Sequence, residues 1–283
     1  MRIIDTHQHL WDRNRFDLPW LKEATEPLSK SHTPETYAQD TVGLGISATI
    51  YMEVDVRLDQ REAEAQYVYS LCDDPQNPMV GAVVGGDPAA REFKAYLDKI
   101  SSPHLKGVRQ VLHGGLPQGY CLKPEFVAGA QELGKRGLCF DLCLRSGELA
   151  DGASLAKKCP ETRFVLDHCG NAPITGTPAQ LGAWKRGLEQ VAACPNTIVK
   201  ISGIIAGTKP GVPAIEQLAP CINQTLDTFG PERVIFASDW PVCTLRASLK
   251  EWITTLKALV ATRSETDQRK LFYENATRFY ELR

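Results

Sequence analysis

The chain has 283 residues, of which 43% are hydrophobic and 23% are charged, and its net charge at pH 7 is −2. These values are typical of a globular protein with a large core. They give no electrostatic argument for binding nucleic acid or an anionic membrane, and no apolar run is long enough to cross a bilayer. Nine cysteines are scattered without Cys-x-x-Cys pairs, which favours reduced thiols and predicts a cytoplasmic protein.

Eight short apolar runs are typical of buried β-strands. They are nearly continuous in apolar residues rather than alternating, which favours parallel strands that are covered on both faces. In chain order we predict strands over residues 2–7, 47–54, 79–85, 105–113, 138–144, 163–168, 197–203 and 233–239.

Segments with apolar residues at helical spacing lie between and after these runs. The clearest are 59–74, 123–137, 178–194, 245–262 and 265–282. Strand and helix thus alternate with a unit of about 35 residues, which suits a (β/α)8 barrel better than a doubly wound sheet. We predict an α/β fold in which residues 1–283 form a single barrel domain.

The connection after the first predicted strand is unusually long and runs from Leu10 to about Asp40. It carries Trp11, Phe16 and Trp20 among charges and prolines. Connections of this length are usually functional or disordered. We predict that this one covers the rim of the active site as a lid or a pocket wall.

The first strand ends with two histidines that are two positions apart. In extended backbone His7 and His9 point to the same side, with Asp5 in phase behind them. Two imidazoles that converge from one strand end suit a metal ion or a polar reaction centre.

Other strand ends also carry polar side chains. Functional groups of a (β/α)8 barrel gather at the carboxyl ends of its strands, so we expect these side chains to share one rim. They are Glu53 on the second strand, Arg109 and His113 on the fourth, His168 on the sixth, Lys200 and Ser202 on the seventh, and Asp239 on the eighth.

Several of these residues have a second interpretation. Glu53 and Lys200 can each be partners in buried ion pairs, and His113 can be a solvated loop residue. Trp240 can offer an apolar surface to a ring or pack against the long loop. The remaining two histidines, His32 and His104, lie in polar loop sequence and are expected at the surface.

Four segments together resemble one known family. "DTHQHLW", "LKGVRQVLH", "FVLDHCGNAP" and "VIFASDWPV" are similar to the amidohydrolase superfamily, specifically to its amidohydrolase-2 branch of small barrels. That branch includes sugar-acid lactonases and 2-pyrone-4,6-dicarboxylate lactonase. The resemblance runs from Ile3 to the last helix, and it implies a (β/α)8 hydrolase.

The resemblance also implies roles for the rim residues. Asp239 would handle the proton of the hydrolytic water, with His168 holding that water or the substrate. His7 and His9 would bind one divalent metal, with zinc as the first candidate, or contact the substrate carbonyl in members that have no metal. In the second case imidazoles and Arg109 would stabilise the oxyanion.

The chain departs from the wider superfamily at the fifth strand, which offers no lysine for carboxylation and no histidine. A binuclear centre is therefore not expected, and a decarboxylase is less favoured. Glu53 is a candidate for the missing ligand and would complete a metal site with His7, His9 and Asp239.

The resulting prediction is the hydrolysis of a sugar-acid lactone in carbohydrate metabolism. Arg109, His113 and Lys200 favour a polar or anionic substrate, while Trp20 and Trp240 favour a ring. A planar dicarboxylate would need several arginines in the pocket. The alternatives are a metal-dependent decarboxylase of an unsaturated or aromatic acid and a barrel that only binds a small ligand. The sequence leaves open whether the protein is a monomer or a homodimer.

Overall fold

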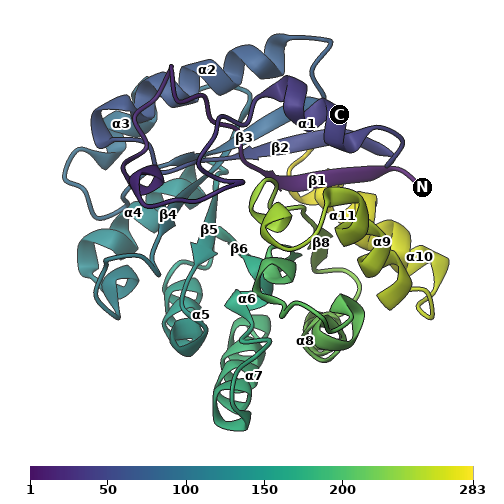
Figure 1. Cartoon of the computed structure of the whole chain (residues 1–283). Helices are drawn as coiled ribbons and strands as arrows, with labels where there is room; N and C mark the ends of the chain where they lie inside the picture. Colours follow the sequence, from purple (N-terminus) through teal and green to yellow (C-terminus); the bar gives the residue numbers. More distant parts are fainter. Residues whose placement is uncertain (283) are drawn as a thin grey trace.

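The computed structural model describes residues 1–282, and in it eight parallel strands lie side by side in the order β1 to β8 (Figure 1). The first and last strands meet through a bridge between Gln8 and Trp240 and a hydrogen bond from Thr6 Oγ1 to the Phe236 carbonyl. The sheet therefore curls into a nearly closed barrel, as predicted. Its strands are β1 (Ile3–Gln8), β2 (Ile46–Met52), β3 (Met79–Gly85), β4 (Leu105–Val111), β5 (Cys139–Cys143), β6 (Arg163–Leu166), β7 (Thr197–Ile201) and β8 (Val234–Phe236).

Most strands stop one to three residues before the predicted end. The physical reason is visible after β6 and β8, where the predicted last residues leave extended backbone. His168 and Asp239 have φ values of 52° and 56°, in the left-handed region. These residues turn away from the sheet and present their side chains at its carboxyl edge.

Helices surround the barrel (Figure 1). They are α1 (Pro34–Thr41), α2 (Arg61–Asp73), α3 (Phe93–Lys99), α4 (Pro124–Lys135), α5 (Leu149–Lys158), α6 (His168–Asn171), α7 (Pro178–Ala192), α8 (Ala214–Phe229), α9 (Leu249–Leu259), α10 (Glu265–Arg269) and α11 (Asn275–Phe279). The predicted final helix is divided, because a π-helical turn over Lys270–Glu274 joins α10 to α11. Sequence reasoning did not place α8, which carries Pro220 in its interior.

Local sequence signals explain where two of the long helices begin. Thr177 and Gln180 form a reciprocal capping box before α7. Ser248 and Glu251 do the same before α9, which starts four residues later than predicted. The residues ahead of it instead form a short 3₁₀ turn at Val242–Leu245.

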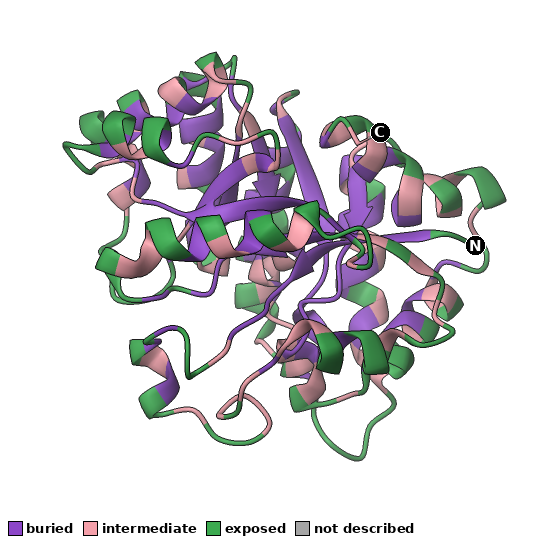
Figure 2. Ribbon diagram, turned by 90° about the horizontal axis from the view of Figure 1, so that it is seen from above, coloured by how far each residue is buried: buried purple, intermediate pink, exposed green. Residues whose placement is uncertain are grey.

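Most buried residues lie on the strands and on the helix faces that cover them (Figure 2), and the buried apolar side chains form two clusters. A large cluster fills the space between the sheet and the outer helices. A smaller cluster, here called the lower layer, fills the barrel interior. It comprises Ile4, Ile50, Met52, Val83, Cys139, Val165, Ile198, Ile235, Ala276 and Tyr280.

The upper part of the same interior is charged. Side chains two apart on a strand share a face, so Lys200 stands above Ile198 and Asp141 stands above Cys139. Together with the strand-end residues His7, Arg109, Asp167 and Asp239, these two side chains make up what we call the upper layer. The candidate site lies directly on it.

The long connection after β1 is tied back onto the barrel. Trp11 and His32 exchange two backbone hydrogen bonds of 2.9 and 2.8 Å. His32 was expected at the surface, but it is only 5% exposed, because its ring packs between Trp11 and Trp240. His104 is partly exposed and pairs with Asp73 at 2.8 Å.

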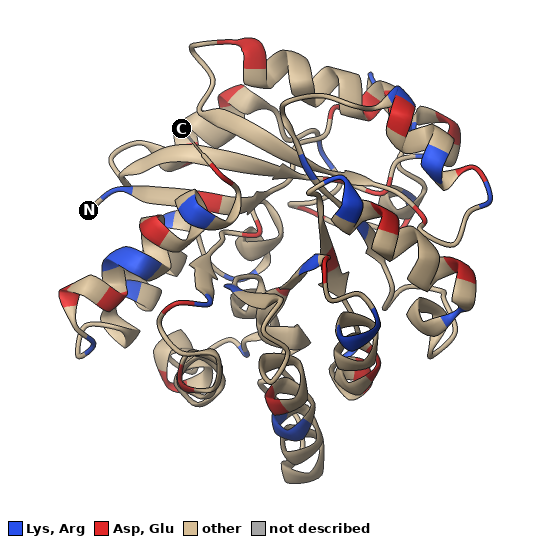
Figure 3. Cartoon of the chain, turned by 180° about the vertical axis from the view of Figure 1, so that it is seen from behind, with Lys and Arg blue, Asp and Glu red and all other residues tan. Residues whose placement is uncertain are grey.

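Charges of both signs are mixed over the outer helices (Figure 3). The nine cysteines are all free thiols, and all but Cys72 are buried. None of the helices within residues 1–282 is long and apolar enough to cross a membrane.

Candidate active site

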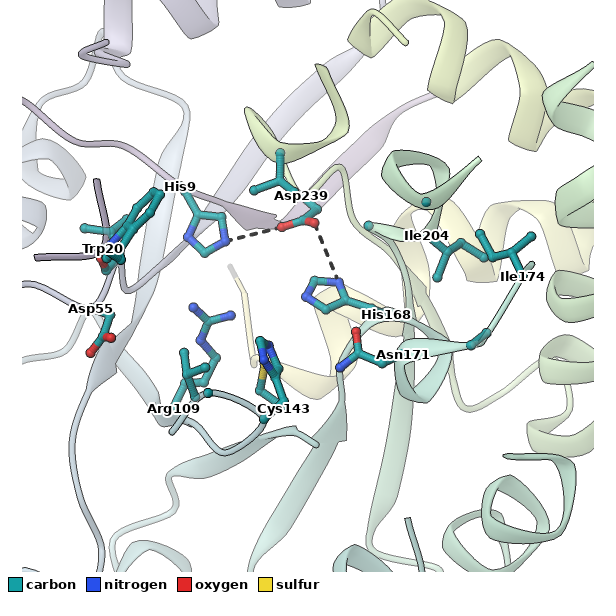
Figure 4. Close-up of a pocket in the computed structure, with 18 of the residues that line it drawn as sticks. His9, Trp20, Asp55, Arg109, Cys143, His168, Asn171, Ile174, Ile204 and Asp239 are labelled. Atoms are coloured by element: carbon teal, nitrogen blue, oxygen red, sulfur yellow. Dashed lines mark hydrogen bonds and ion pairs between the residues drawn. The ribbon is translucent and has the colours of Figure 1, made fainter. Parts of the chain in front are cut away.

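A cavity of about 720 Å³ opens at the carboxyl ends of the strands. Its volume is within the range of small-molecule sites. Polar and charged side chains gather in its centre, and apolar ones form the walls (Figure 4). The polar residues of the lining include His9, Asp55, Arg109, His113, His168, Asn171 and Asp239.

Asp239 lies between two histidines at the floor of this cavity (Figure 4). Its Oδ1 is 3.3 Å from His9 Nε2, and its Oδ2 is 3.9 Å from His168 Nδ1. His168 Nδ1 also lies 2.9 Å from Ser202 Oγ. The two oxygens of one carboxylate thus face two different imidazoles.

His7 lies beneath this floor and is fully buried. Its Nε2 is 3.1 Å from His9 Nε2 and 3.6 Å from Asp239 Oδ1. The predicted meeting of the first strand with the residue after the eighth strand is therefore present. A backbone hydrogen bond from Asp239 N to the His7 carbonyl, at 2.9 Å, holds the two segments together.

Hydrogen bonding fixes the tautomer of His9. Its Nδ1 lies 3.1 Å from the Met52 carbonyl and 3.0 Å from the Glu53 carbonyl. Carbonyl oxygens only accept, so Nδ1 carries the proton and donates it. In this tautomer the lone pair of Nε2 faces His7 and Asp239.

Backbone strain accumulates where the site residues are presented. His168, Cys169, Gly170 and Asn171 all have φ between 49° and 69°, which makes α6 a left-handed turn. Such backbone costs an L-residue roughly 1–2 kcal/mol. Trp184 Nε1 stabilises the turn by donating to the Cys169 carbonyl at 2.8 Å. Strain of this kind is typical of functional positions.

Arg109 reaches the cavity but already has a partner. Its Nε donates to Glu53 Oε1 at 2.6 Å, and its Nη2 donates to the Glu53 carbonyl at 3.1 Å. Glu53 was a predicted metal ligand. The structure instead pairs its carboxylate with Arg109 and with the backbone N–H of Asp55, outside the group formed by His7, His9 and Asp239.

Two predicted substrate-binding residues do not line the cavity in the described part of the chain. Lys200 is fully buried and forms an ion pair with Asp141, the alternative that the sequence had left open. Trp240 is 1% exposed, packs on Tyr37 and His32, and donates from Nε1 to Asp40 Oδ2 at 2.8 Å. Neither side chain reaches the cavity, because both point under the rim of the barrel rather than over it.

Other predicted contacts do lie at the cavity. Trp20 and Trp11 both line it, and Trp20 Nε1 donates to the Val54 carbonyl at 2.8 Å. His113 stands exposed at the mouth beside Gly114.

Sequence reasoning missed two residues that the fold brings to this centre. Asp167 Oδ1 lies 3.3 Å from His7 Nδ1. The signal was its position two residues after Val165, on the inward face of β6. Gly203 was also overlooked, and a Cβ there would lie 2.5 Å from His168 Nδ1 and 2.7 Å from Asp239 Oδ2. Only a glycine leaves those two side chains their present places.

Electrostatics favour an ionised Asp239 beside neutral His7 and His168. Burial raises the pKa of Asp239, but the neighbouring imidazoles of His168, His9 and His7 outweigh it and lower the pKa to about 2. Burial lowers the pKa of His7 well below its ordinary value and also lowers the pKa of His168. Asp239 is therefore a carboxylate at neutral pH.

The group formed by His7, His9 and Asp239 fits a divalent metal ion. Its three facing atoms are 3.1 to 3.6 Å apart. The edge of a tetrahedron with bonds of 2.0–2.1 Å is about 3.3–3.4 Å, as around zinc. Lone pairs and a carboxylate that face each other at such distances repel unless a cation lies between them. Three protein ligands would leave one position open, as in catalytic zinc sites.

The model of the amidohydrolase family matches residues 4–282. The chain belongs to the amidohydrolase family. The resemblance seen in the sequence is thereby confirmed, and so is the predicted class of enzyme, a hydrolase.

Known relatives cover nearly the full length of this amidohydrolase. The L-fucono-1,5-lactonase of Burkholderia multivorans is 27% identical over 290 residues, which cover 99% of this chain and 96% of that protein. The L-rhamnono-gamma-lactonase of Scheffersomyces stipitis is 24% identical, with 99% of each chain covered. An amidohydrolase from B. multivorans, crystallised with bound zinc, has the same fold, with a TM-score of 0.90, 24% identity and both chains fully covered.

Proposed function

We propose that this amidohydrolase opens the lactone ring of a deoxy sugar acid. The observation that carries the proposal is the ionised Asp239 on the cavity floor, held between His9 and His168. The names of the two lactonase relatives support the reaction type.

Asp239 has the position and the charge of a general base. Its Oδ2 faces the cavity beside His168 and can accept a proton from a water molecule that attacks the lactone carbonyl carbon. When the ring C–O bond breaks, the same group returns the proton to the departing alkoxide. Arg109 and His168 would stabilise the oxyanion, a contribution of about 3 kcal/mol for each well-placed donor.

His7, His9 and Asp239 Oδ1 are the residues that would hold a divalent ion. Such an ion would supply Lewis acidity toward the carbonyl oxygen. The zinc bound in the B. multivorans amidohydrolase makes zinc the first ion to test. Within this arrangement the chain keeps the second oxygen of Asp239 for proton transfer.

The lining favours an uncharged lactone over a dicarboxylate. Arg109 is the only arginine among the lining residues of the described chain, and it already forms an ion pair with Glu53. Ile174 and Ile204 form an apolar wall beside the polar centre (Figure 4), and Val242 also lines the cavity. A methyl group in place of a sugar hydroxymethyl would contact this wall without leaving a hydroxyl unpaired. Fucose and rhamnose, whose acids name the two relatives, both carry that methyl group.

The test compares matched lactones with the zinc-loaded enzyme in a pH-indicator assay. L-Fuconic and L-galactonic acid lactones differ only by the hydroxyl at C6, and L-rhamnonic and L-mannonic acid lactones form a second such pair. We expect kcat/KM to favour the deoxy member of at least one pair by about 10-fold or more. Ile174→Ser should reduce that preference.

Controls separate the chemistry from the fold. Asp239→Asn should abolish ring opening, whereas Asp87→Asn, outside the cavity lining, should retain it. The proposal fails if the enzyme opens no lactone, or if it releases carbon dioxide from an unsaturated acid without forming a ring-opened product.

A further inference from the structure

Three charged side chains that the proposed reaction does not use form a chain beneath His7. Lys200 pairs with Asp141, and its Nζ lies 3.4 Å from Asp167 Oδ1. The same Asp167 oxygen lies 3.3 Å from His7 Nδ1. All three charged residues are at most 1% exposed, and none belongs to the cavity lining of residues 1–282. They do not reach a bound substrate.

A buried chain of this kind is poorly explained by stability. Replacing a buried ion pair with apolar side chains of similar volume is often neutral or stabilising. Neither oxygen of Asp167 has a protein partner that meets hydrogen-bond geometry, although Lys200 and Arg109 lie within 4 Å of it. The carboxylate is thus held by charge while it remains available to a donor.

The groups around His7 favour different tautomers of its ring: Asp167 and Arg109 favour one, and Lys200 favours the other. Asp167 at Nδ1 requires a proton there, and Arg109 Nη1, 3.4 Å from Nε2, requires a lone pair at Nε2. Both demands are met when the proton is on Nδ1. Lys200, 3.4 Å from Nδ1, would favour the other tautomer, unless its protons are directed to Asp141 and Asp167. Asp141 therefore decides which way Lys200 acts.

We propose that Asp141, Lys200 and Asp167 are positioning residues that hold His7 in the Nδ1–H tautomer. Asp141 anchors the ammonium group of Lys200, and the charge of Lys200 holds the carboxylate of Asp167 in place. The negative charge of Asp167, 3.3 Å from His7 Nδ1, favours the proton on that nitrogen, so that the lone pair of Nε2 faces His9 and Asp239. Carboxylates that orient histidines in this way are common around metal ligands. The inference goes beyond the proposed reaction and does not depend on the identity of the lactone.

The test replaces the pair by apolar side chains of similar volume, with Asp141→Leu and Lys200→Met in one protein. Long-range ¹⁵N–¹H spectra of histidine-labelled protein at fixed pH report the tautomer, with His7 assigned by the signals that a His7→Gln variant loses. We expect the Nδ1–H signals of His7 to weaken or shift. Zinc affinity, measured by competition with a chromogenic chelator, should fall about 10–100-fold.

A matched control distinguishes positioning from loss of stability. Leu188→Ala opens a cavity in α7, outside the barrel interior, and should lower Tm without changing the His7 signals or the zinc affinity. The proposal is overturned if the folded double variant keeps both the spectrum and the zinc affinity of the parent.

A second variant covers the case in which the double variant does not fold. Asp167→Asn keeps the shape but removes the charge, and it should alter the His7 signals and weaken zinc binding. Unchanged signals in this protein would equally refute the proposal. Neither measurement contains a lactone, so a failed lactonase assay and a failed tautomer measurement are separate results.

Discussion

The lower and upper layers of the barrel interior share five strands, β1, β5, β6, β7 and β8, but differ in polarity and charge. Below, apolar side chains from seven strands pack together with Ala276 and Tyr280 of the C-terminal helix and turn. Above, five of these strands or the residues that follow them present three carboxylates, a lysine and a histidine, and β4 adds an arginine. On β7, for example, Ile198 packs in the lower layer, and Lys200, two residues later, carries a charge in the upper layer.

The backbone differs in the same way. Within residues 1–282, six non-glycine residues have positive φ, and five of them follow β2, β6 or β8 on the cavity side. Residues that stabilise the fold and residues of the candidate site are thus separated along individual strands rather than between domains. Strain and buried charge are tolerated above because well-packed apolar surface lies below, where burial contributes about 25 cal/mol per Å².

The largest expected effect concerns the upper layer. Asp239→Asn should lower kcat by about 10²–10⁴-fold, because it removes the proposed base. The free energy of unfolding should fall little, since asparagine tolerates the φ of 56° at this position. Steady-state kinetics and denaturant titration of the same protein check both statements. A large loss of unfolding free energy together with a retained kcat would contradict this prediction.

The lower layer should behave in the opposite way. Ile198→Ala removes buried methyl groups two residues before Lys200, and it should cost about 2–5 kcal/mol of unfolding free energy. Tm should fall by several degrees while kcat at 25 °C stays at the parent value. A drop in kcat that matches the drop in stability would show that the two layers are not separable.

Gly203→Ala tests how tightly the upper layer is packed. The new methyl group would meet His168 Nδ1 and Asp239 Oδ2 within 2.7 Å, so we expect kcat to fall about 10²-fold through misplacement of these groups. Gly211→Ala is the matched control, because its φ is 79° and no atom lies within 4 Å of the added Cβ. It should share the backbone strain, roughly 1–2 kcal/mol, and keep the activity. Equal activities of the two variants would contradict the prediction.

A buried acid outside both layers gives the smallest effect. Burial, with the charge of Glu53, raises the pKa of Glu64 to about 7. A folded-state pKa above the unfolded value of 4.5 adds stability that is fully present below pH 4.5 and is lost as pH rises through 7. From pH 5 to pH 8 the parent should therefore lose on the order of 2–3 kcal/mol relative to Glu64→Gln. Parallel stability curves of the two proteins would refute this.

Local sequence patterns were enough to predict the alternation of strands and helices and the rim of the barrel that carries the polar site residues. Continuous apolar runs such as residues 79–85 predict parallel strands, because both faces of such strands are covered. The turn-forming ends of those runs placed His7, His9, His168 and Asp239 at one edge. Local patterns suffice for this, since strand period and strand direction fix which end a residue occupies.

The partner of each charged side chain could not be predicted from local patterns and became clear only from the folded barrel. Lys200, Glu53 and Trp240 occupy strand ends that looked equivalent to those of the cavity residues, yet Asp141, Arg109 and Asp40 hold them. Asp167 shows the converse. The sequence pointed to its neighbour His168 as a site residue, whereas in the structure Asp167 itself also contacts His7. These pairings join residues up to 200 positions apart and depend on side-chain direction after barrel closure, which no local periodicity encodes.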